Sequence, residues 1–153
     1  MTHSARIVPM NRLLLLFPVA LISCSSTAPP DAAASKAYLE KAAAEPGAVR
    51  TPSGLIYREL RAGTGTSPAA TDTVNVTYKG TFTDGKKFDS SDGIKFPLNR
   101  VIRCWTEGVQ KMKVGGKSQL VCPASIAYGE NGSPPDIPGG ATLVFEIELL
   151  GIG

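Results

Sequence analysis

From residue 51 onward the chain has the two-residue period of β-strands, because apolar and polar side chains alternate over several short runs. Strands are predicted at 55–60, 73–82, 117–122 and 142–150. The turn Asp84-Gly85 predicts a hairpin that leads into two further runs, 87–91 and 95–98. One face of the last strand carries Leu143, Phe145, Ile147 and Leu149. The pattern therefore predicts a sheet with one apolar face.

One stretch, 101–112, has the period of a helix instead. Its apolar face is formed by Ile102, Trp105, Val109 and Met112. Gly108 lies inside this helix, where glycine costs about 1 kcal/mol relative to alanine. We therefore expect a packing reason for Gly108, namely a close approach of the helix to the sheet. Several antiparallel strands and one packed helix predict an α+β domain.

Two further segments complete the pattern. Residues 35–45 are rich in alanine and predict a short helix, which Pro46-Gly47 ends and which is marginal alone. Residues 123–140 form a long loop with four prolines and four glycines. A loop of this length inside a compact domain is usually functional.

The first 23 residues are typical of a signal peptide. Arg6 and Arg12 supply its positive start, and the ten apolar residues at 13–22 are too few to cross a bilayer, which takes about 20. Residues 21–24 (LISC) resemble a bacterial lipobox, with Cys24 as the lipidated residue; the alternative is an ordinary secretory signal with a chance cysteine. Residues 24–50 would then be a lipidated tether with a short helix. Its acyl chains would bind a membrane firmly, and Ser25 favours the outer membrane.

Composition and charge narrow the function further. Hydrophobic residues make up 42% and charged residues 19% of the chain, which indicates a globular protein. Without the two signal arginines, 14 basic residues face 13 acidic ones, so no basic patch argues for nucleic acid. The single histidine, His3, lies in the predicted signal, which excludes a histidine triad, base or metal site. We predict no metal. Residues 114–118 look like the end of a phosphate-binding loop, but Lys111 stands where that motif needs glycine.

Five blocks carry a resemblance to a known family. They are VTYKG at 76–80, DGKKFDSS at 84–91, VIRCWTEGV at 101–109, AYG at 127–129 and ATLVF at 141–145. In order and spacing they resemble FKBP-type peptidyl-prolyl isomerases, and most of all the bacterial secreted lipoprotein members. The resemblance implies an isomerase domain at 51–153, with a curved antiparallel sheet wrapped around one short α-helix. Long N-terminal dimerisation helices, which related bacterial proteins carry, are missing, so we expect a monomer.

The resemblance also implies a site. The pocket would be apolar and need no cofactor. Trp105 would form the floor under a proline ring, and the Tyr128 hydroxyl and the Ile102 backbone N–H would bind the substrate. Asp89 would orient Tyr78 or polarise the amide. The implied walls are Tyr78, Phe88, Phe96, Val101, Ile102 and Phe145, and the implied catalytic residues are Tyr78, Asp89, Trp105 and Tyr128. By residue type alone, an aromatic on a strand more often packs in a core, and Asp89 could cap a turn.

The sequence departs from the family pattern near this pocket. The segment 92–95 (DGIK) is shorter than in well-known members, so one wall aromatic is replaced by Ile94 or lost. Ser133 and Asp136 stand in the long loop where other members carry apolar or imidazole groups. The resemblance implies proline-containing polypeptides as partners and macrolides such as rapamycin as ligands. The departures affect the expected affinity for macrolides.

Two cysteines remain once Cys24 is set aside. Cys104 starts the predicted helix, at a position that is usually glycine in the family, and Cys122 ends the next strand. A secreted protein meets an oxidising compartment, which favours a disulfide between them. That bond would close a loop of 17 residues and contribute about 3 kcal/mol. The alternative is two buried thiols.

Three functions are compatible with these patterns. The first is a peptidyl-prolyl isomerase that assists the folding of envelope proteins. The second is a module that binds prolyl peptides as a chaperone or adaptor, with little turnover. The third is a structural lipoprotein of the envelope, which leaves the pocket residues without a role.

Overall fold

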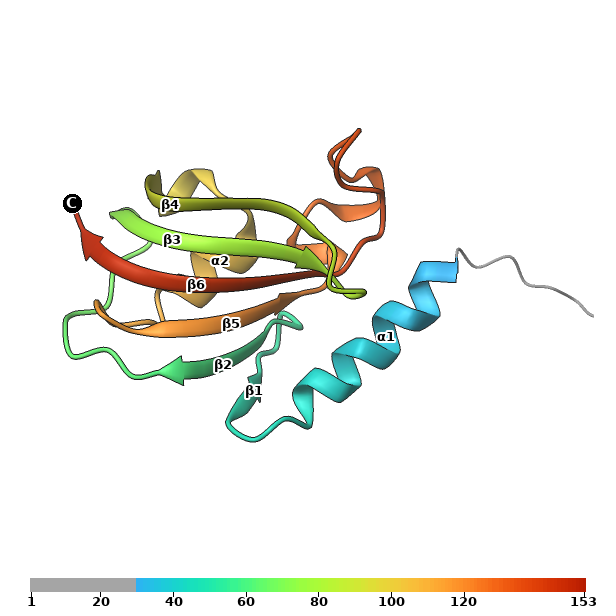
Figure 1. Cartoon of the computed structure of the whole chain (residues 1–153), viewed down its shortest axis with the longest axis horizontal. Coiled ribbons are helices and arrows are strands. Elements are labelled where there is room, and N and C mark those ends of the chain that lie inside the picture. Colours follow the sequence, from blue (N-terminus) through green and yellow to red (C-terminus); the bar gives the residue numbers. More distant parts are fainter. Residues whose placement is uncertain (1–29) are drawn as a thin grey trace, which may run out of the picture.

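The computed structural model describes residues 30–153; the predicted signal peptide and Cys24 lie outside this range. Six strands form one antiparallel sheet in the order β1-β2-β5-β6-β3-β4 (Figure 1). They span Ala48–Arg50 (β1), Ile56–Arg61 (β2), Thr73–Phe82 (β3), Lys87–Pro97 (β4), Lys117–Cys122 (β5) and Leu143–Ile152 (β6). The helices are α1 (Pro30–Ala43) and α2 (Arg103–Val109), and Leu98–Arg100, Ala124–Ile126 and Gly129–Asn131 form 3₁₀ turns. The predicted α+β class is confirmed.

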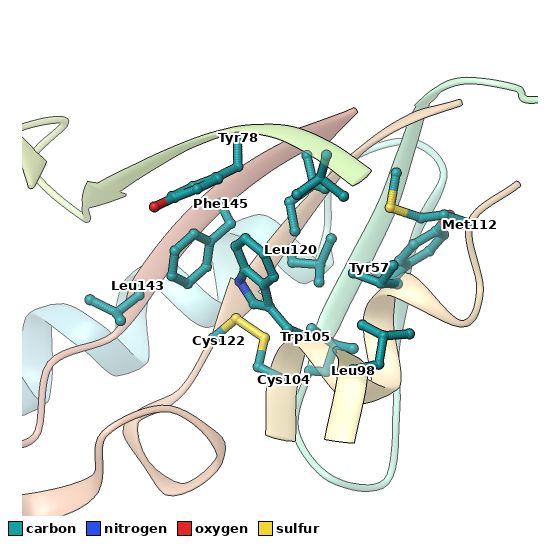
Figure 2. Close-up of a cluster of buried hydrophobic side chains, with 14 of the residues drawn as sticks. Tyr57, Tyr78, Leu98, Cys104, Trp105, Met112, Leu120, Cys122, Leu143 and Phe145 are labelled. Carbon is teal, nitrogen blue, oxygen red and sulfur yellow. A yellow bond between two sulfur atoms is a disulfide. The ribbon is translucent and has the colours of Figure 1, made fainter. Parts of the chain in front are cut away.

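The alternation read from the sequence matches the buried face of the sheet. Strands β3 and β5 have the predicted bounds, and β6 runs two residues further than predicted. The four apolar residues predicted for one face of β6 are buried, and so are Val74 and Val76 of β3. Together with α2 they form the main core (Figure 2). Burial of alternate side chains therefore sets which face of each strand meets α2.

Helix α2 is shorter than the predicted 101–112. Ile102 has extended backbone angles and caps the helix, and the chain leaves α2 after Val109 through tighter turns. In these turns the amides of Lys111 and Met112 bond to carbonyls three residues earlier. Gly108 has the expected packing reason. A Cβ there would lie 2.9 Å from Leu120 Cγ and would overlap Leu120 Cδ2, on strand β5.

Strand β4 is continuous where the sequence suggested two runs with a loop at 92–95. Tyr78 of β3 pairs with Ser91, and Val76 pairs with Ile94, so Asp92 and Gly93 of β4 stand opposite the single residue Thr77 and β4 carries one extra residue. Gly93 has φ +70° in this bulge, and its N–H donates to Thr77 Oγ1 at 3.3 Å. The bulge stays in the sheet because the pairing resumes on both sides of it.

The outer face of the sheet is covered in part by α1 (Figure 1). Ile56, Val121 and Val144 form a second buried cluster there, against Tyr38 and Leu39 of the helix. Helix α1 begins five residues before the predicted start. Strand β1 lies in the range assigned to the tether, and it pairs with β2. Three residues are too short a run to be recognised by alternation. Within residues 30–153 no helix is long and apolar enough to cross a bilayer.

A disulfide joins Cys104 at the start of α2 to Cys122 at the end of β5, as predicted (Figure 2). The two Cα atoms are 5.9 Å apart and both side chains are fully buried. The bond therefore attaches the helix to the sheet at the residue next to Trp105.

The long loop after β5 is folded rather than extended. It contains two 3₁₀ turns and a short bridge between Ser133 and Ile137. Ile126 and Ile137 are buried and join the main core. These anchors fix the segment that carries Tyr128, which lies between the two turns.

Candidate active site

The aromatic side chains around Trp105 hold its indole from three sides. Trp105 lies in α2, and it meets the rings of Tyr78, Phe96 and Phe145 almost perpendicularly, at centroid distances of 5.0, 5.5 and 5.3 Å. Figure 2 shows Tyr78 and Phe145 approaching the indole from the sheet. Edge-to-face pairs contribute about 0.5–1.5 kcal/mol each beyond their buried area. The indole therefore has one well-defined orientation, with 4% of the residue's surface exposed.

A cavity of about 340 Å³ opens above this cluster. That volume suits a small organic group, since ligand pockets in proteins measure about 300–1,000 Å³. Its lining residues are Tyr78, Phe88, Asp89, Phe96, Arg100, Val101, Ile102, Trp105, Tyr128 and Phe145. All nine residues that the sequence assigned to the pocket line it, and β3, β4, β6, α2 and two loops contribute them.

The walls of the cavity differ from the sequence-based expectation at two residues, Ile94 and Arg100. Ile94, one candidate to replace a wall aromatic, does not line the cavity but packs against the core opposite Val76. Arg100 lines the cavity and was not anticipated. It stands one residue before a recognised block, in a polar stretch, so the sequence carried no signal that it would face a pocket.

The polar part of the site centres on Tyr78 and Asp89. The Tyr78 hydroxyl donates to Asp89 Oδ2 at 2.5 Å, and the Ser90 N–H donates to Asp89 Oδ1 at 2.9 Å. Burial raises the pKa of Tyr78 well above its usual value, and the Asp89 carboxylate raises it further. Tyr78 is therefore a neutral donor at physiological pH. Two roles were expected for Asp89, orienting Tyr78 or polarising the amide. The contact between Tyr78 and Asp89 is the one that the orienting role requires.

Besides the Trp105 Nε1–H and the Arg100 guanidinium, two hydrogen-bond donors around the cavity have no acceptor among residues 30–153. One is the backbone N–H of Ile102, which precedes α2, and the other is the Tyr128 hydroxyl. Tyr128 is 40% exposed, so a ligand can reach it. In the same part of the chain, no three His, Cys, Asp or Glu side chains lie close enough to hold a metal ion.

An aromatic floor, apolar walls and unpaired donors at the rim can accommodate an apolar ring that carries a hydrogen-bond acceptor. The sequence pattern of the FKBP-type peptidyl-prolyl cis-trans isomerase family matches residues 64–150, more than half of the chain. The chain belongs to this family.

Individual relatives agree with that assignment. The isomerase FkpA of Aeromonas hydrophila is 51% identical over 119 residues, covering 75% of this chain and 44% of the relative. The crystal structure of FkpA from Escherichia coli superposes with a TM-score of 0.77 at 46% identity, over 80% of this chain and 59% of that one. A peptidyl-prolyl isomerase of Pseudomonas syringae has the same TM-score at 38% identity, over 80% and 93%. The chain spans about half the length of the two FkpA proteins.

Proposed function

We propose that this protein catalyses cis-trans isomerisation of the peptide bond before proline. The observation that carries the proposal is the convergence of Trp105, the Tyr78–Asp89 pair and two unpaired donors on one apolar cavity. Rotation about the bond has a barrier of about 18–20 kcal/mol, because resonance is lost in the twisted state. The twisted amide has less charge separation than the planar one, so a pocket that excludes water favours it.

Each residue has a role in this proposal. Trp105 supports the proline ring, and its perpendicular neighbours keep the indole flat beneath it. The Ile102 N–H and the Tyr128 hydroxyl bind carbonyls of the substrate on either side of the ring. Asp89 fixes the Tyr78 hydroxyl, which closes the wall of the pocket. The reaction needs no proton transfer, and none of these groups has to titrate.

The test measures isomerisation of an X-Pro tetrapeptide by the purified protein. We expect acceleration that rapamycin, the ligand implied by the family resemblance, suppresses. Tyr128→Phe should lower kcat/KM about 2- to 12-fold, because one hydrogen bond contributes about 0.5–1.5 kcal/mol. Tyr38→Phe is the matched control, since Tyr38 belongs to α1 and packs on the opposite face of the sheet.

Asp89→Asn distinguishes the two roles expected for Asp89, orienting Tyr78 and polarising the amide. The amide keeps an acceptor for Tyr78 but loses the charge, so a moderate loss of activity indicates orientation and a severe loss indicates polarisation of the amide. A folded protein that accelerates no peptide would contradict the isomerase. Binding of prolyl peptides without acceleration would then identify the protein as a prolyl-binding module.

We further infer that the protein acts in the bacterial cell envelope on folding polypeptides, anchored through Cys24. A disulfide between two buried cysteines is typical of an oxidising compartment and supports this location. The anchor rests on the sequence of residues 13–24, which lie outside the described range. Metabolic labelling with palmitate should mark the wild-type protein and leave Cys24→Ala unlabelled. Labelling of neither would contradict the anchor and leave the isomerase proposal intact.

A further inference from the structure

The pocket contains two charged side chains with different surroundings. Asp89 is engaged through both oxygens, by the Tyr78 hydroxyl and the Ser90 N–H. Arg100 is exposed, and its guanidinium makes no hydrogen bond or salt bridge with any residue in 30–153. The cavity therefore presents a partnered anion and an unpartnered cation.

The segment that carries Arg100 is held firmly. Arg100 ends the 3₁₀ turn that begins at Leu98, a fully buried residue. The Leu98 N–H donates to the Asp72 carbonyl at 2.9 Å, and the Leu98 carbonyl accepts from Thr106 Oγ1 of α2 at 2.7 Å. Two residues further, Ile102 offers its unpaired N–H to the same cavity. A peptide bound by that N–H would therefore lie close to the guanidinium.

We propose that Arg100 makes the pocket selective for prolyl peptides with an acidic side chain next to the proline, a selectivity that rests on the isomerase function proposed above. Arginine binds a carboxylate through two parallel hydrogen bonds, and the one other charged side chain lining the cavity, Asp89, is already engaged through both oxygens. A basic side chain at the same place meets repulsion instead. An ion pair at an exposed rim changes affinity modestly, which corresponds to about a two- to fivefold preference for glutamate over glutamine.

The experiment compares kcat/KM for tetrapeptides that differ beside the proline. One series is Ala-Xaa-Pro-Phe and the other Ala-Ala-Pro-Xaa, with Glu, Gln or Lys as Xaa, in a protease-free assay at low salt. The variants are Arg100→Gln and Arg100→Glu. Arg103→Gln is the matched control, because Arg103 is exposed, lies three residues away and does not line the cavity.

In at least one series we expect the order Glu, Gln, Lys for the wild type and for Arg103→Gln. The ratio of Glu to Gln should fall to about one in Arg100→Gln and invert in Arg100→Glu. It should also shrink at 0.5 M salt, where the Debye length is only about 4 Å. No preference in either series, or a preference that survives both Arg100 variants, would overturn the proposal.

The same peptides separate failure of this proposal from failure of the isomerase. If the folded protein accelerates none of them, their dissociation constants can be measured by the fluorescence of Trp105, the only tryptophan in the chain. The Glu-to-Gln ratio of the constants then takes the place of the kinetic ratio. A ratio that depends on Arg100 upholds the selectivity in a binding module, and a ratio of one in the wild type rejects it.

Discussion

Replacing Gly108 by alanine tests how closely α2 approaches the sheet. The added methyl would lie 2.9 Å from Leu120 Cγ and overlap Leu120 Cδ2, whereas carbon atoms pack at about 3.5–4.0 Å. Leu120 is fully buried, so it has little space to move. Overpacking costs about 1–3 kcal/mol, and two overlapping atoms place this site near the upper end. Alanine in a helix returns about 1 kcal/mol relative to glycine. We expect a net loss of about 1–2 kcal/mol in the free energy of unfolding.

Urea unfolding followed by Trp105 fluorescence measures this loss. Gly151→Ala is the control, because a Cβ at Gly151 meets no atom within 4 Å, and it should leave the stability unchanged or raise it by up to about 1 kcal/mol. In a Leu120→Ala background the obstructing side chain is gone, so Gly108→Ala should become neutral or stabilising. A stability equal to that of the wild type for Gly108→Ala alone, or the same loss in both backgrounds, would refute the reasoning. Because Trp105 lies in the same helix, the displaced α2 should also lower kcat/KM.

Two further changes test the disulfide and the buried phenol. The double variant Cys104→Ala/Cys122→Ala should lower the free energy of unfolding by about 3 kcal/mol, mainly because its unfolded chain has more freedom; reductant should then destabilise the wild type but leave the variant unaffected. Burial first, and Asp89 second, raise the pKa of Tyr78 above its ordinary 10.0. The folded protein therefore keeps a proton that the unfolded chain loses, so this contribution is complete below about pH 10 and is lost above it. Unfolding measured from pH 9 to 11 should show a shallower decline for Tyr78→Phe, and identical slopes would contradict the shift.

Alternation along the chain was enough to place β3, β5 and β6. This information is local, because a side chain on a strand points to one face or the other at every second residue. The approach of α2 to the sheet was also predictable, since a glycine inside a helix calls for a close neighbour. Segments 92–95 and 101–112 were placed less well. Whether Asp92 and Gly93 form a loop or a bulge depends on pairing with β3, and the length of α2 depends on turns that close after Val109.

The pocket residues also fall into two groups: those that the sequence could name and those that only the tertiary structure places. Five of the pocket's six aromatic residues stand in blocks shared with a family, and Phe96 lies between two such blocks. For the aromatic residues on strands, alternation also indicates the inner face. Residue order cannot show which inner-face rings fill the core and which leave a cavity, because that depends on how β3, β4, β6 and α2 close around Trp105. Arg100 is the clearest case. In the sequence it is one cation among many, and it faces the pocket only because Leu98, in the same turn, is buried and its carbonyl is held by Thr106 of α2.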